Sequence, residues 1–210
     1  EALRSNTTAD SNTAVGYQAA YSNTTGARHT ALGYQAGYNN TTAANITAIG
    51  TQALRSNTTG AQNTAVGTYA NYYNTTGNTL AAFGVSALET NTTGSQNTGL
   101  GFQALYSNTT ASNNTAVGYQ AMYSYQTGGD TVAFGTQAGY SLNGNGNSTF
   151  IGRSSGYETT GATNTFVGYH SGYAVSTGSK NTILGVYNGN QGGLDIRTSN
   201  NNIVLSDGDG

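Results

Sequence analysis

The chain has 210 residues, a net charge of -2 at pH 7, and neither cysteine nor proline. Charged residues make up 7% of it, far below the roughly 25% of an ordinary soluble domain. Its six lysines and arginines are dispersed and form no basic stripe, so nucleic acid is excluded as an expected partner. No apolar run approaches the ~20 residues of a transmembrane helix, so no membrane insertion is expected. The absence of cysteine excludes disulfides and thiolate metal sites.

A sequence unit of 17 residues recurs along almost the whole chain, marked by the glycine of motifs such as Asn-Thr-Ala-Val-Gly. Ten intervals separate the marker glycines, nine of 17 residues and one of 16. The marker glycines are Gly16, Gly33, Gly50, Gly67, Gly84, Gly101, Gly118, Gly135, Gly152, Gly168 and Gly185. A short fixed period indicates stacked turns that bury apolar surface only against their neighbours. The sequence therefore predicts an all-β fold, a parallel β-solenoid of 17-residue turns over residues 1–189.

Each unit begins with a predicted strand. In the first unit, Thr13 to Ala19 follows the period-two alternation of a strand. The residue before the marker glycine is large and apolar in all eleven units, so we expect this column to be buried. The expected buried column comprises Val15, Leu32, Ile49, Val66, Phe83, Leu100, Val117, Phe134, Ile151, Val167 and Leu184. The other strand face carries small residues such as Ala14, and we expect neighbouring chains to meet there.

A turn rich in Ser, Asn, Thr and Gly closes each unit, as at residues 22–26 and 56–60. Asn and Gly tolerate left-handed backbone, and Ser, Thr and Asn side chains bond to turn backbone. The single one-residue deletion lies between Tyr157 and Gly161, inside this turn. A deletion is tolerated best where backbone pairing is weakest, which supports the assignment.

The last three units predict a change of core packing. The small residue two positions before the marker glycine becomes Phe150, Phe166 and Ile183. In the same three units the alanine column after the strand becomes Ser155, Ser171 and Asn188, and the next residue is Gly156, Gly172 and Gly189. Close-packed interiors require that volume gained at one position be lost at its neighbour, so we infer that these columns face a common interior.

The segment 190–210 departs from the repeat. It contains two short predicted strands, at 194–196 and 202–205. We expect a β-rich neck or connector that leads into a further C-terminal domain.

The unit N-T-A-V-G-Y-Q-A resembles the head repeat of YadA-like trimeric autotransporter adhesins over residues 12 to 185. The resemblance implies a left-handed parallel β-roll and a homotrimer along a common axis, although the family's unit is shorter. The tail S-N-N-N-I-V-L-S-D-G-D-G resembles segments of phage tail fibres that precede a C-terminal intramolecular chaperone domain. Together the two resemblances point to the shaft of a trimeric fibre.

The sequence offers no convergent chemistry. A repeat places like groups in rows, whereas catalysis needs unlike groups at one point. Glu89 and Asp130 are more than two turns apart, and His29 and His170 are many turns apart. Both histidines are interpreted as tolerated surface variants. We expect no enzymatic activity, no cofactor and no metal site.

A column of tyrosines lies five residues after the marker glycine and is interrupted by Arg55 and Glu89. It has two interpretations: stacked rings that cover an edge or a subunit seam, or a contact stripe for sugars or protein. The residues of this candidate contact stripe are Tyr21, Tyr38, Tyr72, Tyr106, Tyr123, Tyr140, Tyr157 and Tyr173.

The expected function is a non-enzymatic structural shaft of a trimeric phage tail fibre with an adhesive, receptor-binding role. The expected partners are two further copies of the chain and a cell-surface receptor or glycan, and the expected location is a virion tail or the extracellular surface. A bacterial surface adhesin or extracellular filament subunit is one alternative. A monomeric ligand- or ice-binding solenoid is another.

Overall fold

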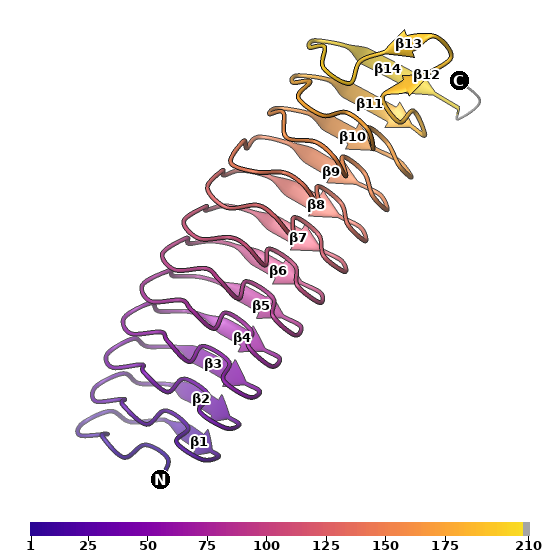
Figure 1. Cartoon of the computed structure of the whole chain (residues 1–210). Coiled ribbons are helices and arrows are strands. Elements are labelled where there is room, and N and C mark those ends of the chain that lie inside the picture. The colour runs from indigo at the N-terminus through magenta and orange to yellow at the C-terminus, as the bar shows by residue number, and fades with distance from the viewer. Residues whose placement is uncertain (208–210) are drawn as a thin grey trace.

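The computed structural model describes residues 1–207 and shows a rod of stacked turns (Figure 1). One short strand from each turn joins a single parallel sheet of 12 strands, in the order β1 to β11 followed by β14. These strands are β1 (Thr13–Val15), β2 (His29–Leu32), β3 (Ile46–Ile49), β4 (Thr64–Val66), β5 (Ala81–Phe83), β6 (Thr98–Leu100), β7 (Thr115–Val117), β8 (Val132–Phe134), β9 (Thr149–Ile151), β10 (Thr165–Val167), β11 (Thr182–Gly185) and β14 (Ile203–Ser206). A two-stranded antiparallel hairpin, β12 (Asn190–Gln191) and β13 (Leu194–Asp195), lies between β11 and β14 in the chain. The predicted all-β, parallel β-solenoid is confirmed, with about 11 turns of roughly 17 residues.

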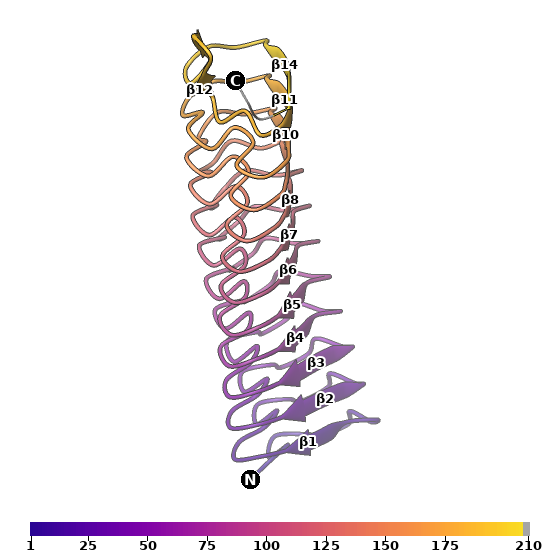
Figure 2. The ribbon, with the colours of Figure 1, turned by 90° about the vertical axis from the view of Figure 1, so that its right-hand side faces the viewer.

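Equivalent residues of successive turns are in register. Thr13 pairs with Thr30 and Val15 with Leu32, and equivalent residues pair in the same way up to β11. The strands accordingly lie along one side of the rod (Figure 2). Each sequence column is therefore a straight row of side chains parallel to the rod axis.

The strands are shorter than the alternation predicts, because the backbone leaves the pleat at the marker glycine. In one unit, Gly50 has φ 128°, and Gln52 and Leu54 are left-handed with φ of 57° and 50°. Left-handed backbone costs non-glycine residues about 1–2 kcal/mol each. The amides remain paired between turns: Gln52 N donates to Tyr34 O (2.8 Å) and Leu54 N to Ala70 O (3.0 Å). Hydrogen bonds between turns thus hold a wall that is not a strand.

The marker glycine is required by the stacking itself. A Cβ at Gly33 would lie 2.6 Å from the carbonyl oxygen of Gly50 in the next turn, and φ at Gly33 is 134°. No other residue type fits this contact without moving the backbone of a neighbouring turn.

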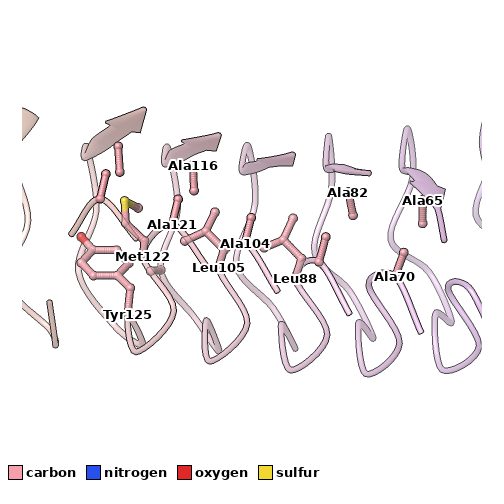
Figure 3. Packing of buried hydrophobic residues seen from close by; sticks show 14 of the residues in the cluster. Ala65, Ala70, Ala82, Leu88, Ala104, Leu105, Ala116, Ala121, Met122 and Tyr125 are labelled. Carbon is pink, nitrogen blue, oxygen red and sulfur yellow. The ribbon is translucent and has the colours of Figure 1, made fainter. Parts of the chain in front are cut away.

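The core is built from the small strand residues, so the expected assignment of the strand faces is wrong. Ala65, Ala82 and Ala116 are fully buried and point toward the opposite wall, where Ala70 and Leu88 lie (Figure 3). The walls of the flattened turn are so close that alanine fills the gap between them. The large apolar residues beside the alanines therefore project outward, because side chains alternate across a strand.

The column expected to be buried is half-buried or exposed throughout. Val15 is 62% exposed and Phe134 56%. We call this column the aliphatic row; its members are Val15, Leu32, Ile49, Val66, Phe83, Leu100, Val117, Phe134, Ile151, Val167 and Leu184.

The interior also contains amide ladders. Asn74 donates through Nδ2 to Asn57 Oδ1 (2.7 Å) and to Gly77 O (3.0 Å), and Asn91 Nδ2 donates to Asn74 Oδ1 (3.0 Å). These asparagines are fully buried. Buried amides are tolerated when they are hydrogen-bonded, and here each one ties its own turn to the next.

The inferred change of core packing near the C-terminal end is confirmed. Phe150, Phe166 and Ile183 are fully buried. A Cβ at Gly156 would lie 2.5 Å from the ring of Phe150. The glycines of the opposite wall thus leave room for rings in place of alanines.

The sheet continues beyond residue 189. β14 pairs with β11 in register, Thr182 with Ile203 and Leu184 with Leu205. Both strands predicted in the segment 190–210 are present, as β13 and β14; the last three residues of that segment lie outside the described residues. Within residues 1–207 there is no helix of the length and apolar character that a membrane span requires.

Candidate functional site

The tyrosine column forms a stacked ladder of half-buried rings. Tyr123 and Tyr140 have centroids 5.2 Å apart with planes at 5°, and Tyr157 and Tyr173 stack at 5.0 Å and 3°. The ring faces are therefore directed along the rod axis and covered by neighbouring rings. What the ladder presents outward is ring edges and hydroxyls, which suits hydrogen bonding better than flat stacking on a sugar.

Two charged residues interrupt this ladder, and the first of them bridges the rings on either side of it. The Arg55 guanidinium lies 5.4 Å from the ring centroid of Tyr38 and 5.7 Å from that of Tyr72, so it fills the space of one ring by cation–π contact. Glu89 occupies the turn next to Tyr106, and its negative charge is the main cause that raises the pKa of the Tyr106 hydroxyl.

A second set of rings follows the marker glycines and is much more exposed. We call it the corner row: Tyr17, Tyr34, Thr51, Thr68, Val85, Phe102, Tyr119, Thr136, Arg153, Tyr169 and Val186. Tyr17 and Tyr34 stack at 5.4 Å and 10°, and so do Phe102 and Tyr119. Unlike the tyrosine column, the corner row has gaps where threonine replaces a ring.

Glutamines lie between these two sets of rings. Gln52 Nε2 donates to Gln35 Oε1 (2.9 Å), and Gln120 Nε2 donates to Gln103 Oε1 (2.9 Å). Arg55 Nε also donates to Gln35 Oε1 (3.1 Å), which shows that the glutamine row borders the tyrosine ladder. This side of the rod therefore combines aromatic rings with aligned amides.

The outer face of the sheet is an apolar feature that runs along the rod. It carries the aliphatic row and, two residues earlier in each strand, a row of mostly threonines such as Thr64 and Thr115. Neither row contains a charged residue. Contiguous apolar surface of this kind makes the outer face of the sheet a candidate interaction site.

The two histidines differ in their surroundings. His29 is buried, contrary to the expectation of a surface variant: its Nε2 lies 3.2 Å from Asn40 Nδ2, and burial lowers its pKa. His29 lies four residues before its marker glycine, a position that holds buried asparagines such as Asn63 and Asn97 in other turns. His170 is half-buried and stacks on Tyr169 at 4.0 Å, and burial and then the charge of Arg153 lower its pKa.

The described residues contain no cluster of three or more His, Cys, Asp or Glu side chains placed to hold a metal ion. At the C-terminal end, Asp195 pairs with Arg197 (2.7 Å), and hydrogen bonds from Arg197 lower the pKa of Asp195 to about 2. Both side chains are exposed, and the two residues are only two positions apart at the end of β13.

Sequence reasoning missed the aliphatic row as a surface feature. The alternation of the strand carries no signal that separates the two faces, because both hold a regular row of apolar residues. Comparison of the chain with protein-family models, with curated proteins and with solved structures finds no match.

Proposed function

We propose that this chain is the structural shaft of a homotrimeric, adhesive fibre of the phage tail-fibre kind, with a bacterial surface adhesin or extracellular filament subunit as the alternative setting. The shaft would stand on a virion tail or an extracellular surface and would act without catalysis. The observation that carries the proposal is the aliphatic row, an apolar surface that follows the rod through eleven turns.

Association of copies explains the composition of this face. A row of Val, Leu, Ile and Phe side chains in water costs about 25 cal/mol for each Å² of apolar surface left exposed. Because equivalent residues are in register, the same face on another copy matches it along its full length. Three copies around a common axis cover one another's sheet faces in a closed arrangement, which avoids open-ended aggregation. The YadA-like resemblance favours three copies in parallel orientation.

Light scattering and sedimentation equilibrium test the proposal. The wild-type chain should be a trimer whose mass does not change over a wide concentration range. Leu100→Glu combined with Phe134→Glu should give folded monomers, because charges on the aliphatic row oppose its burial. The matched control places the same charges on the exposed turn, Thr93→Glu with Thr110→Glu, and should remain trimeric. A wild-type chain that is folded and monomeric at all concentrations would refute the trimer.

A second candidate function uses the same face. The threonine row and the aliphatic row form a regular, uncharged array on a parallel sheet, as an ice-binding surface would require. This function needs a face open to water, so it applies to a monomer. Thermal hysteresis that disappears in Thr64→Lys with Thr115→Lys, in a monomeric wild-type chain, would favour it over the fibre shaft.

A further inference from the structure

The corner row has a gap of a single turn at Thr136. Tyr119 lies in the turn before and Arg153 in the turn after, and Thr136 itself is exposed. Strands in a sheet are about 4.8 Å apart, so Tyr119 and Arg153 are separated by roughly 10 Å along the rod. The gap is therefore one ring wide and is bounded by an aromatic ring and a guanidinium.

The gap is about twice as long as the distance at which this chain stacks its own rings, so it has room for one further ring between its two ends. Tyr119 stacks on Phe102 at 5.4 Å and 10°, so one of its faces is covered. Its other face is directed toward Thr136, which supplies no ring, and Tyr119 is 48% exposed. A flat ring placed over Thr136 would continue the ladder at its own distance from Tyr119 and from Arg153.

Arg153 gives the gap a positive charge. Its NH1 donates to the Tyr169 hydroxyl (3.3 Å), and its guanidinium lies 5.7 Å from the centroid of that ring. Within residues 1–207 the ion pairs are Arg4 with Glu1 and Arg197 with Asp195, so no carboxylate of the described chain pairs with Arg153. A ligand in the gap would meet an unneutralised cation.

A hydrogen-bond acceptor, the side-chain oxygen of Gln137, lies in the same turn as Thr136. Gln137 Nε2 donates to Gln120 Oε1 (3.3 Å), but in the following turn the glutamine row continues with Ser154 instead of an amide. In the described part of the chain, no donor from that turn reaches Gln137 Oε1.

From this juxtaposition we propose that the gap binds an acidic saccharide, a pyranose ring that bears a carboxylate. The apolar face of the ring stacks on Tyr119, the carboxylate pairs with Arg153, and a ring hydroxyl donates to Gln137 Oε1. A neutral sugar leaves Arg153 unpaired, and a simple carboxylate leaves the face of Tyr119 open. The inference gives a ligand class to the adhesive role proposed above and rests on it for biological meaning, although the site lies within one chain.

Binding of short galacturonic acid oligomers, measured by calorimetry on the full chain, tests this inference. Neutral galactose oligomers test the sugar ring without the charge, and acetate tests the charge without the ring. We expect binding of the uronate oligomer to be at least tenfold tighter than that of either, and to weaken with added salt because ion pairs at exposed sites are screened.

Three variants locate the site. Thr136→Tyr fills the gap with the chain's own ring and should reduce uronate affinity more than tenfold with an unchanged circular dichroism spectrum. Thr51→Tyr, which adds the same ring beside Tyr34, is the matched control and should bind as wild type. Arg153→Gln should abolish the preference for the uronate over the neutral oligomer.

Equal affinity for the acidic and neutral oligomers, an absence of binding, or unchanged binding in Thr136→Tyr would overturn the inference. Light scattering on the same samples separates this result from the proposed function. A chain that forms trimers but binds no saccharide would contradict the saccharide site only. A monomeric chain that binds uronate would contradict the trimer only.

Discussion

The ring of Phe150 occupies the space that a side chain at position 156 would need. Both residues are buried; a Cβ at Gly156 would lie 2.5 Å from the ring, and Gly156 is left-handed with φ 63°. Four turns earlier, the equivalent positions hold the opposite combination, Ala82 and Leu88. One interior volume is thus shared between two walls in different ways along the same rod.

This relationship predicts a strong coupling between positions 150 and 156. Gly156→Leu alone should destabilise the chain by about 1–3 kcal/mol or more, through overpacking. Phe150→Ala alone should cost about 3–5 kcal/mol by leaving a cavity. The double variant recreates the Ala82–Leu88 combination and should be more stable than the sum of the two changes allows, with a coupling energy of at least about 1 kcal/mol. Denaturant unfolding of the four proteins measures it, and additive effects would show that the two residues do not share space.

Asn71 predicts a stabilising substitution. Its side chain is buried in a row that holds Leu54 and Leu88 in the adjacent turns, and neither of its amide atoms has a hydrogen-bond partner. An unsatisfied buried amide costs about 1–3 kcal/mol. Asn71→Leu should therefore raise the free energy of unfolding, but by less than that amount, because asparagine tolerates the left-handed backbone at this position (φ 51°) better than leucine does; denaturant titration measures the change.

The matched control for Asn71 lies three residues away. Asn74 is equally buried but belongs to the hydrogen-bonded ladder, so Asn74→Leu should lower the free energy of unfolding by a similar amount. If both substitutions changed stability in the same direction, hydrogen bonding would not be what separates the two asparagines.

His29 predicts a loss of stability in mild acid. Burial lowers its pKa in the folded chain below the usual 6.5, and Asn40 Nδ2, a donor, faces its Nε2. The unfolded chain therefore takes up a proton at a higher pH than the folded chain does. The contribution of neutral His29 to the free energy of unfolding is fully present above about pH 6.5. It is lost as the pH falls through about 6.5 toward the lowered pKa of the folded chain, at no more than about 1.4 kcal/mol per pH unit.

Denaturant titrations at several pH values between neutral and mildly acidic conditions measure this slope. His29→Asn restores the residue typical of its row and should remove most of the slope. His170→Gln, which changes a less buried histidine, should leave most of it. Identical slopes in the wild type and in His29→Asn would contradict the assignment.

Adjacent residues of β7 test which sheet face is interior. Ala116 is fully buried between the walls, whereas Val117 belongs to the aliphatic row on the outer face. Ala116→Leu should destabilise the chain by about 1–3 kcal/mol or more, because the gap has no room for the added volume. Val117→Leu should change the free energy of unfolding by no more than about 0.5 kcal/mol. A larger effect at Val117 than at Ala116, measured by denaturant unfolding of a monomeric chain, would reverse the faces.

The sequence by itself determined the repeat, and with it the number of turns, the parallel in-register stacking and the exchange of volume between Phe150 and Gly156. These properties depend only on the position of a residue within its unit, because equal units stack in register. Two of the three strands after residue 189, β13 and β14, were also predictable from their composition, although the pairing of β13 with β12 and of β14 with β11 was not.

Only the tertiary structure decided which strand face is interior. An alternating strand has two faces, and a shift of one residue exchanges them, so the alternation around Val66 is compatible with either orientation. The distance between the two walls of each turn determines which strand face is interior. Left-handed residues such as Gln52 and Leu54 bring the opposite wall so close that Ala65 fits where Val66 does not. The direction of the rings was likewise decided by stacking between turns, which covers the faces of Tyr140 and leaves one face of Tyr119 open.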